Sequence, residues 1–233
     1  MKKYFNCVMI AVVAIALLSV SCGKEHDETK NPSVITAKDV INSSSDIAMV
    51  KAVMDSYRDE EIIATANYEK DGFKLTLPKT VPNECLMKVG DEFGDEEWVE
   101  ISDPSAKLGV TWVYAFDKKD KEIGDFYFLG ITTRSYVAAM YIYADKKFTM
   151  KGKIDEDSYI DEYNCSFNKG WNVLYFVESM FESSSLITTQ KPADVKLEWV
   201  FEDSWWKSQN EHNSVLQKHT TLAKKRALRD STF

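Results

Sequence analysis

Hydrophobic and polar residues alternate with a period of two along most of the chain between Ile47 and Glu202. The alternation is clear at Phe73, Leu75 and Leu77, which are separated by Lys74 and Thr76. Such a pattern places the apolar side chains on one face of a β-strand and the polar side chains on the other. It predicts half-buried strands in antiparallel sheets.

Ten segments of this kind are predicted as strands: residues 47–54, 61–68, 73–77, 110–117, 123–131, 136–143, 147–154, 159–167, 171–178 and 195–202. Turn residues separate them, as at Lys70-Asp71-Gly72, where we expect Gly72 to supply a positive φ. Residues 136–143 are apolar on both faces, which predicts a central strand covered on both sides or one whose outer face meets another layer. Residues 47–202 contain no stretch with helical periodicity that is long enough to predict a helix. The predicted fold class is therefore all-β, an antiparallel β-sandwich of about ten strands, with a calycin- or lipocalin-like barrel as the alternative.

Two irregular stretches interrupt the strand pattern. Residues 78–109 contain Pro82, Pro104 and a cluster of acidic residues, and residues 182–194 are rich in Ser and Thr. Long connections on a rigid β scaffold often carry binding sites. We therefore interpret both stretches as candidate binding loops.

The first 22 residues have the pattern of an export signal. Lys2 and Lys3 precede the apolar residues 8–18, and small residues lead to Cys22. The segment resembles the bacterial lipoprotein signal, in which the cysteine is acylated, although Ser19 stands where that signal prefers leucine. We predict a signal peptide at residues 1–21, lipidation of Cys22, and a disordered tether over residues 22–42. The acidic run at residues 24–28 resembles a signal for export to the cell surface, so the predicted location is the outer face of the outer membrane.

The charge of the chain is unevenly distributed. The whole chain carries −8; because residues 1–22 carry +2 and residues 204–233 carry +4, the intervening body carries −14. Nucleic acid is an unsuitable partner for such a body, because phosphate binding requires a clustered basic face. We place the β domain at residues 43–203, followed by a basic extension, residues 204–233, whose spacing of apolar residues is typical of a short amphipathic helix.

Two cysteines remain after the anchor, Cys85 and Cys165. A disulfide between them would contribute about 4 kcal/mol in the chain-entropy model. Both residues fall in phase with apolar neighbours, so two buried free thiols are an equal alternative.

Few residues suggest a chemical site. Asp91, Asp95, Glu96 and Glu97 could supply oxygen ligands to Ca²⁺, but a solvated acidic loop explains them better. Trp98 and Trp112 could form a platform for sugar rings, although most aromatic residues of an all-β chain belong to its core.

The sequence also argues against an enzyme. All three histidines, His26, His212 and His219, lie outside the predicted β domain, which excludes histidine-dependent triads and histidine-bound zinc within it. Phosphate-cradling and dinucleotide motifs are absent from the sequence, and no cofactor is predicted. We predict a protein without catalytic activity.

Three segments are characteristic in combination. The first is residues 63–78, which end in Leu77-Pro78. The second is Lys169-Gly170-Trp171, and the third is residues 196–201 around Trp199. Together they resemble a group of uncharacterised Bacteroidota-type outer-membrane lipoproteins. The resemblance covers about residues 47–202, and its motifs are structural, with Trp171 and Trp199 expected in the core. It implies no site residue, and the basic extension departs from the pattern.

The sequence leaves three functions open. The first is a membrane-anchored, surface-exposed lipoprotein that binds a glycan or protein partner through loops of a β-sandwich. The second is a calycin-like carrier of a small apolar ligand, and the third is a structural envelope protein.

Overall fold

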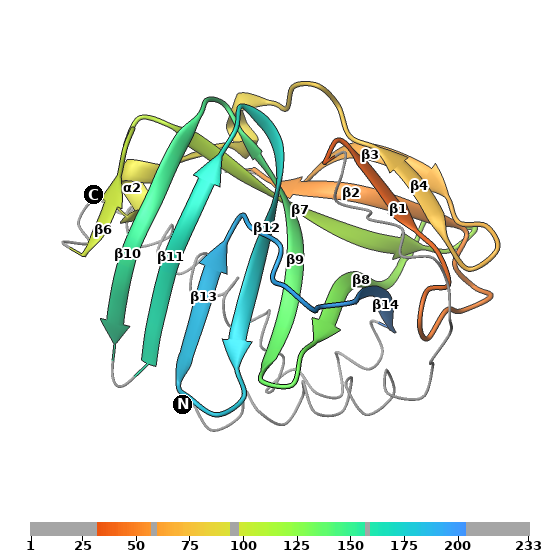
Figure 1. Ribbon diagram of the computed structural model, residues 1–233. Helices are drawn as coiled ribbons and strands as arrows, with labels where there is room; N and C mark the ends of the chain where they lie inside the picture. Colours follow the sequence, from red (N-terminus) through yellow and green to blue (C-terminus); the bar gives the residue numbers. More distant parts are fainter. Residues whose placement is uncertain (1–31, 57–59, 94–97, 157–158, 204–233) are drawn as a thin grey trace. The chain divides into compact units, whose positions relative to one another are not determined.

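The computed structural model describes residues 32–56, 60–93, 98–156 and 159–203 (Figure 1). Most of these residues lie in strands, and two short segments are helical. The elements in chain order are β1 (Val34–Ala37), β2 (Met49–Asp55), β3 (Glu60–Asn67), β4 (Phe73–Thr76), η3 (Asn83–Cys85), β5 (Met87–Lys88), α2 (Val89–Phe93), β6 (Val99–Ile101), β7 (Lys107–Phe116), β8 (Glu122–Ile131), β9 (Ser135–Ala144), β10 (Phe148–Glu156), β11 (Tyr159–Phe167), β12 (Gly170–Ser179), β13 (Ser184–Thr188) and β14 (Leu197–Asp203).

The strands build one large sheet and one small sheet. The large sheet has the order β3-β2-β7-β8-β9-β12-β13-β11-β10-β6, with β14 joined to β8 and β5 joined to β7, and the small sheet pairs β1 with β4. Because β3 and β6 are at opposite ends of this order and do not pair, the sheet stays open. The all-β prediction is confirmed, the architecture is consistent with a sandwich, and the barrel alternative is wrong.

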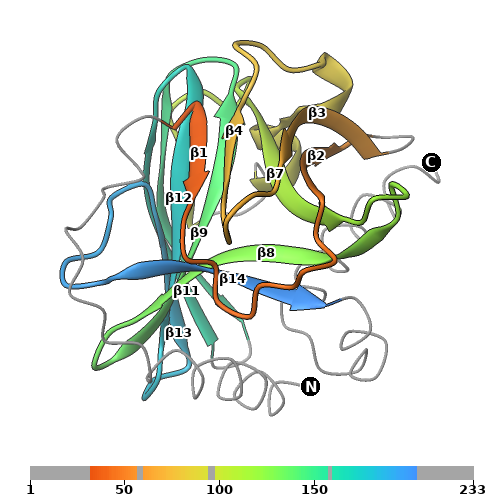
Figure 2. The same cartoon turned by 90° about the vertical axis from the view of Figure 1, so that its right-hand side faces the viewer.

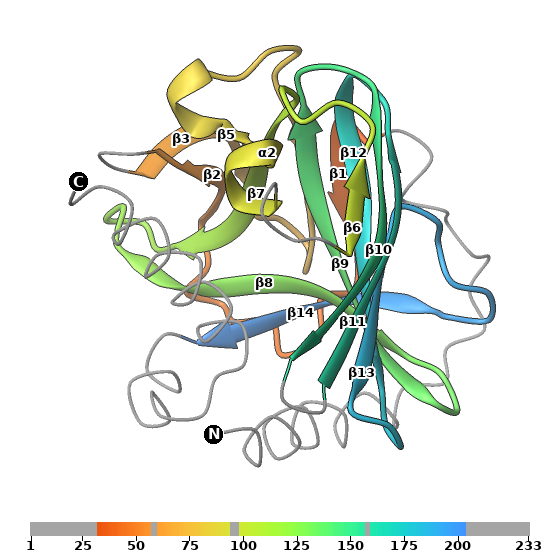
Figure 3. The ribbon, with the colours of Figure 1, turned by 90° about the vertical axis from the view of Figure 1, so that its left-hand side faces the viewer.

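The large sheet bends where β7 changes its partner. The first half of β7 pairs with β9, from Leu108 opposite Ala144 to Thr111 opposite Tyr141. Its second half pairs with β8, and β8 in turn pairs with the first half of β9. The strands β2, β3 and β7 therefore diverge from the plane of β9 to β13, as Figures 1 and 3 show.

The small sheet fills the space between the two diverging parts of the large sheet (Figure 2). Ile35 in β1 lies opposite Leu75 in β4, and both side chains are completely buried. The backbone of Ile41 then exchanges hydrogen bonds of 2.9 Å with Trp199 and Phe201 of β14. The predicted tether over residues 22–42 is therefore wrong in its second half, because residues 34–41 belong to the fold.

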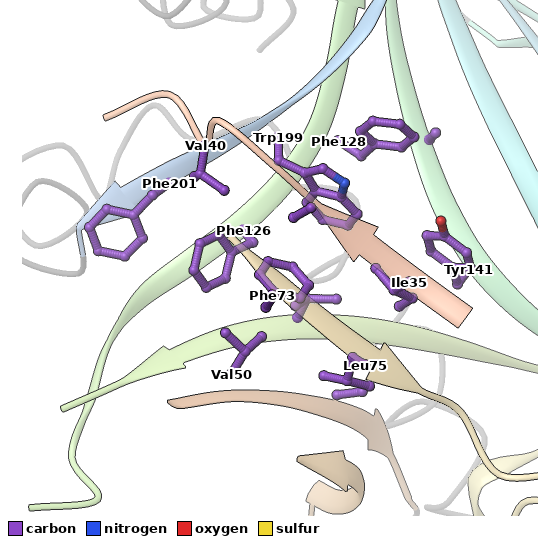
Figure 4. Packing of buried hydrophobic residues seen from close by; sticks show 14 of the residues in the cluster. Ile35, Val40, Val50, Phe73, Leu75, Phe126, Phe128, Tyr141, Trp199 and Phe201 are labelled. Carbon is purple, nitrogen blue, oxygen red and sulfur yellow. The ribbon is translucent and has the colours of Figure 1, made fainter. Parts of the chain in front are cut away.

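Aromatic rings occupy the centre of this core. Phe73 lies 5.0 Å from Phe126 and 5.4 Å from Trp199 between ring centroids, and Phe128 stacks on Trp199 at 4.8 Å (Figure 4). The indole Nε1 of Trp199 donates a hydrogen bond of 3.1 Å to the carbonyl oxygen of Thr36, which satisfies its polar group inside the core. The prediction that Trp199 fills the core is confirmed.

A second hydrophobic cluster covers part of the opposite face of the large sheet. Val89 from α2 and Val99 from β6 pack there against Phe148 and Phe167, whose rings stack at 4.7 Å. Figure 3 shows α2 and β6 on this side of the sheet. In β9, Tyr141 belongs to the first cluster and Ile142 to the second. The segment 136–143 is thus covered on both faces in its second half, as its sequence predicts.

Both predicted binding loops belong to the framework. In residues 78–109, Cys85, Leu86, Val89 and Val99 are buried. Residues 182–194 contain β13, which lies between β12 and β11 and pairs with β11 in parallel. The expectation that both stretches are irregular loops is wrong, because short strands and buried side chains fix them to the sheet.

The turn between β3 and β4 differs in one detail from its prediction. Lys70 and Asp71, with φ of 52° and 57°, adopt the left-handed conformation that we expected of Gly72. Glycine is required at position 72 for a different reason: a Cβ there would collide with the carbonyl oxygen of Ala37 in β1.

Candidate binding surface

The predicted lipidation site, Cys22, lies outside the described residues, as do the signal peptide, the first part of the tether and the basic extension 204–233. In the portions of the chain that the structure describes, none of the helices has the length and apolar character needed to cross a membrane.

The two cysteines of the β domain are both buried and free. Cys85 packs with Met54, Leu86 and Tyr143, whereas Cys165 belongs to the cluster beneath α2. Burial raises the pKa of the Cys165 thiol to about 12, and burial also raises the pKa of the Cys85 thiol. The predicted disulfide is not formed, and the alternative of two buried thiols describes the structure.

The predicted acidic metal site is not assembled by the residues that the structure describes. Asp91 lies in α2 and pairs with Lys88 at 2.9 Å. Asp95, Glu96 and Glu97 fall in the undescribed segment 94–97. Across the described ranges, no three His, Cys, Asp or Glu side chains gather where they could hold a metal ion.

The two predicted platform tryptophans lie in different parts of the sheet. Trp98 precedes β6 and is 69% exposed, while Trp112 is half-buried in β7 opposite Val53 of β2. β6 ends the strand order on one side, and β7 lies near the other end. The structure does not bring the two rings together as one platform.

Instead, acidic and aromatic side chains meet in one row across β11, β13, β12 and β9. In the strand register, Asp161 and Glu178 both lie opposite Ser185, and Tyr136 lies opposite Glu178. Tyr159 precedes Asp161 by two residues and so shares its face. We call Tyr136, Tyr159, Asp161, Glu178 and Ser185 the acid–tyrosine row. Since neighbouring strands are about 4.8 Å apart, the Cα atoms of Asp161 and Glu178 are separated by about 10 Å.

Hydrogen bonds connect one side of this row. The hydroxyl of Ser185 donates to Oδ1 of Asp161, and Tyr159 shares a side-chain hydrogen bond with Ser185. The carboxyl of Glu178 is half-buried beside them. Its burial, followed by the negative charge of Asp161, raises the pKa of Glu178 to about 7. Burial and the charges of Glu178 and Asp161 likewise raise the pKa of Tyr159.

The same face of the sheet carries a second polar group further along β8. Tyr127 donates a hydrogen bond of 3.0 Å to Asp125 and shares another with Glu202 of β14. Burial, followed by the charge of Glu202, raises the pKa of Tyr127. Nearby, Lys51 forms an ion pair with Asp120 at 2.5 Å. Lys51 is thus already neutralised within this group.

Exposed aromatic side chains lie near the acid–tyrosine row. Phe176 is 37% exposed and lies two residues before Glu178 on the same face of β12. Phe181 is 77% exposed in the turn after β12, whereas Ile160 of β11, 39% exposed, projects from the reverse face. Large aromatic groups beside hydrogen-bonding carboxylates are typical of ligand and partner contacts, because they combine apolar area with orientation. The row therefore has the composition of a binding surface.

Sequence reasoning missed this row, although one signal was available. Asp161 is in phase with Tyr163 and Cys165, and Glu178 is in phase with Leu174 and Phe176, so each acid interrupts an apolar face. A charged residue in the apolar phase of a strand is unusual and deserves a functional test.

Comparisons with protein-family models, with curated proteins and with solved structures found no match to this chain.

Proposed function

We propose that the protein is a membrane-anchored, surface-exposed lipoprotein without catalytic activity that binds a glycan or protein partner through the acid–tyrosine row. The observation that supports this proposal is the row itself, with Asp161, Glu178 and two tyrosines on one face beside the exposed Phe176. Carboxylates accept hydrogen bonds from a partner, and aromatic rings contribute apolar contact area to sugars and proteins alike.

The binding surface is tested by removing one exposed ring. We expect Phe176→Ser to weaken capture of a partner, because the ring is exposed beside the row. The bait is residues 23–203, used on a glycan array and in a pull-down from the bacterial envelope. Ile62→Ser is the matched control, since Ile62 is 54% exposed on β3, far along the strand order.

The comparison of the two variants decides the proposal. Capture that is lost with Phe176→Ser and kept with Ile62→Ser supports the row as the site. Equal capture by both variants and the parent would place the site elsewhere. Failure of the parent to capture any partner would favour the structural envelope protein instead.

Membrane anchoring through acylated Cys22 is the second part of the proposal. It is supported by the sequence of residues 1–22, in which a basic start and an apolar run lead to Cys22-Gly23. Growth with radiolabelled palmitate should label the full chain and leave Cys22→Ser unlabelled. Protease treatment of intact cells should remove the β domain if the anchored protein faces outward. An unlabelled parent protein would refute lipidation.

A further inference from the structure

We draw no further inference here: the strongest candidate, the outer face of β2, β7 and β8 that carries Val53, Tyr114 and Tyr127, supports none because nothing among the described residues shows what covers it.

Discussion

Ile35→Ala tests whether the fold begins before residue 43. The side chain of Ile35 is completely buried against Leu75 in the small sheet. Truncation to alanine removes the equivalent of three methylene groups, which corresponds to about 2.4 kcal/mol of transfer free energy. A residual cavity adds to this value, so we expect the free energy of unfolding to fall by about 3 kcal/mol.

Urea denaturation of residues 23–203, followed by tryptophan fluorescence, measures this loss. The dependence of the unfolding free energy on urea should stay unchanged, because the same surface is exposed on unfolding. Thr36→Ala is the matched control, since Thr36 is only half-buried and its carbonyl, which accepts from Trp199, is retained. Losses within about 0.5 kcal/mol of each other for the two variants would refute the assignment of β1 to the core.

Three further predictions concern the thiols, a glycine and one carboxyl group. Cys85 and Cys165 should resist a thiol reagent at pH 8 in the native state and react in urea; rapid native labelling would contradict their burial. Gly152→Ala should lower the free energy of unfolding by more than about 2 kcal/mol, because a Cβ at this φ of 146° would overlap the carbonyl oxygen of Trp98. Gly170→Ala is the control and should lower it by only about 1 kcal/mol in urea melts, because the space around Gly170 is open. The native state keeps a proton on Glu178 that the unfolded state releases above pH 4.5, so unfolding free energy should fall as pH rises from about 4.5 to 7. Glu178→Gln should remove this fall, and an unchanged pH profile would show that Glu178 is not responsible.

All ten strands predicted from alternation are present in the structure, because a one-sided core imposes that period on the sequence. The missed strands are short or polar. β1 contributes only Ile35 and Ala37 to the core, and β13 begins with two serines. Strands of this kind carry little alternation of their own, and their pairing with distant strands holds them in place.

The acid–tyrosine row could be predicted only in part. The sequence shows Asp161 and Glu178 in the apolar phase of their strands, and this unusual position is readable without a structure. Their proximity depends on Ser185, because β13 lies between β12 and β11 and pairs with β11 in parallel. A prediction from hairpins pairs only strands that follow one another in the sequence. It therefore cannot place β13 between β12 and β11.

The contact between Thr36 and Trp199 joins residues that are 163 positions apart. Because β1, β4 and β14 share one core, its last strand is available only after nearly the whole chain has been synthesised. At about 5–20 residues per second, the ribosome needs roughly 10–40 s to reach residue 203. The nascent chain therefore lacks its finished core throughout this interval, and any factor that binds only unfolded polypeptide has that time in which to engage it.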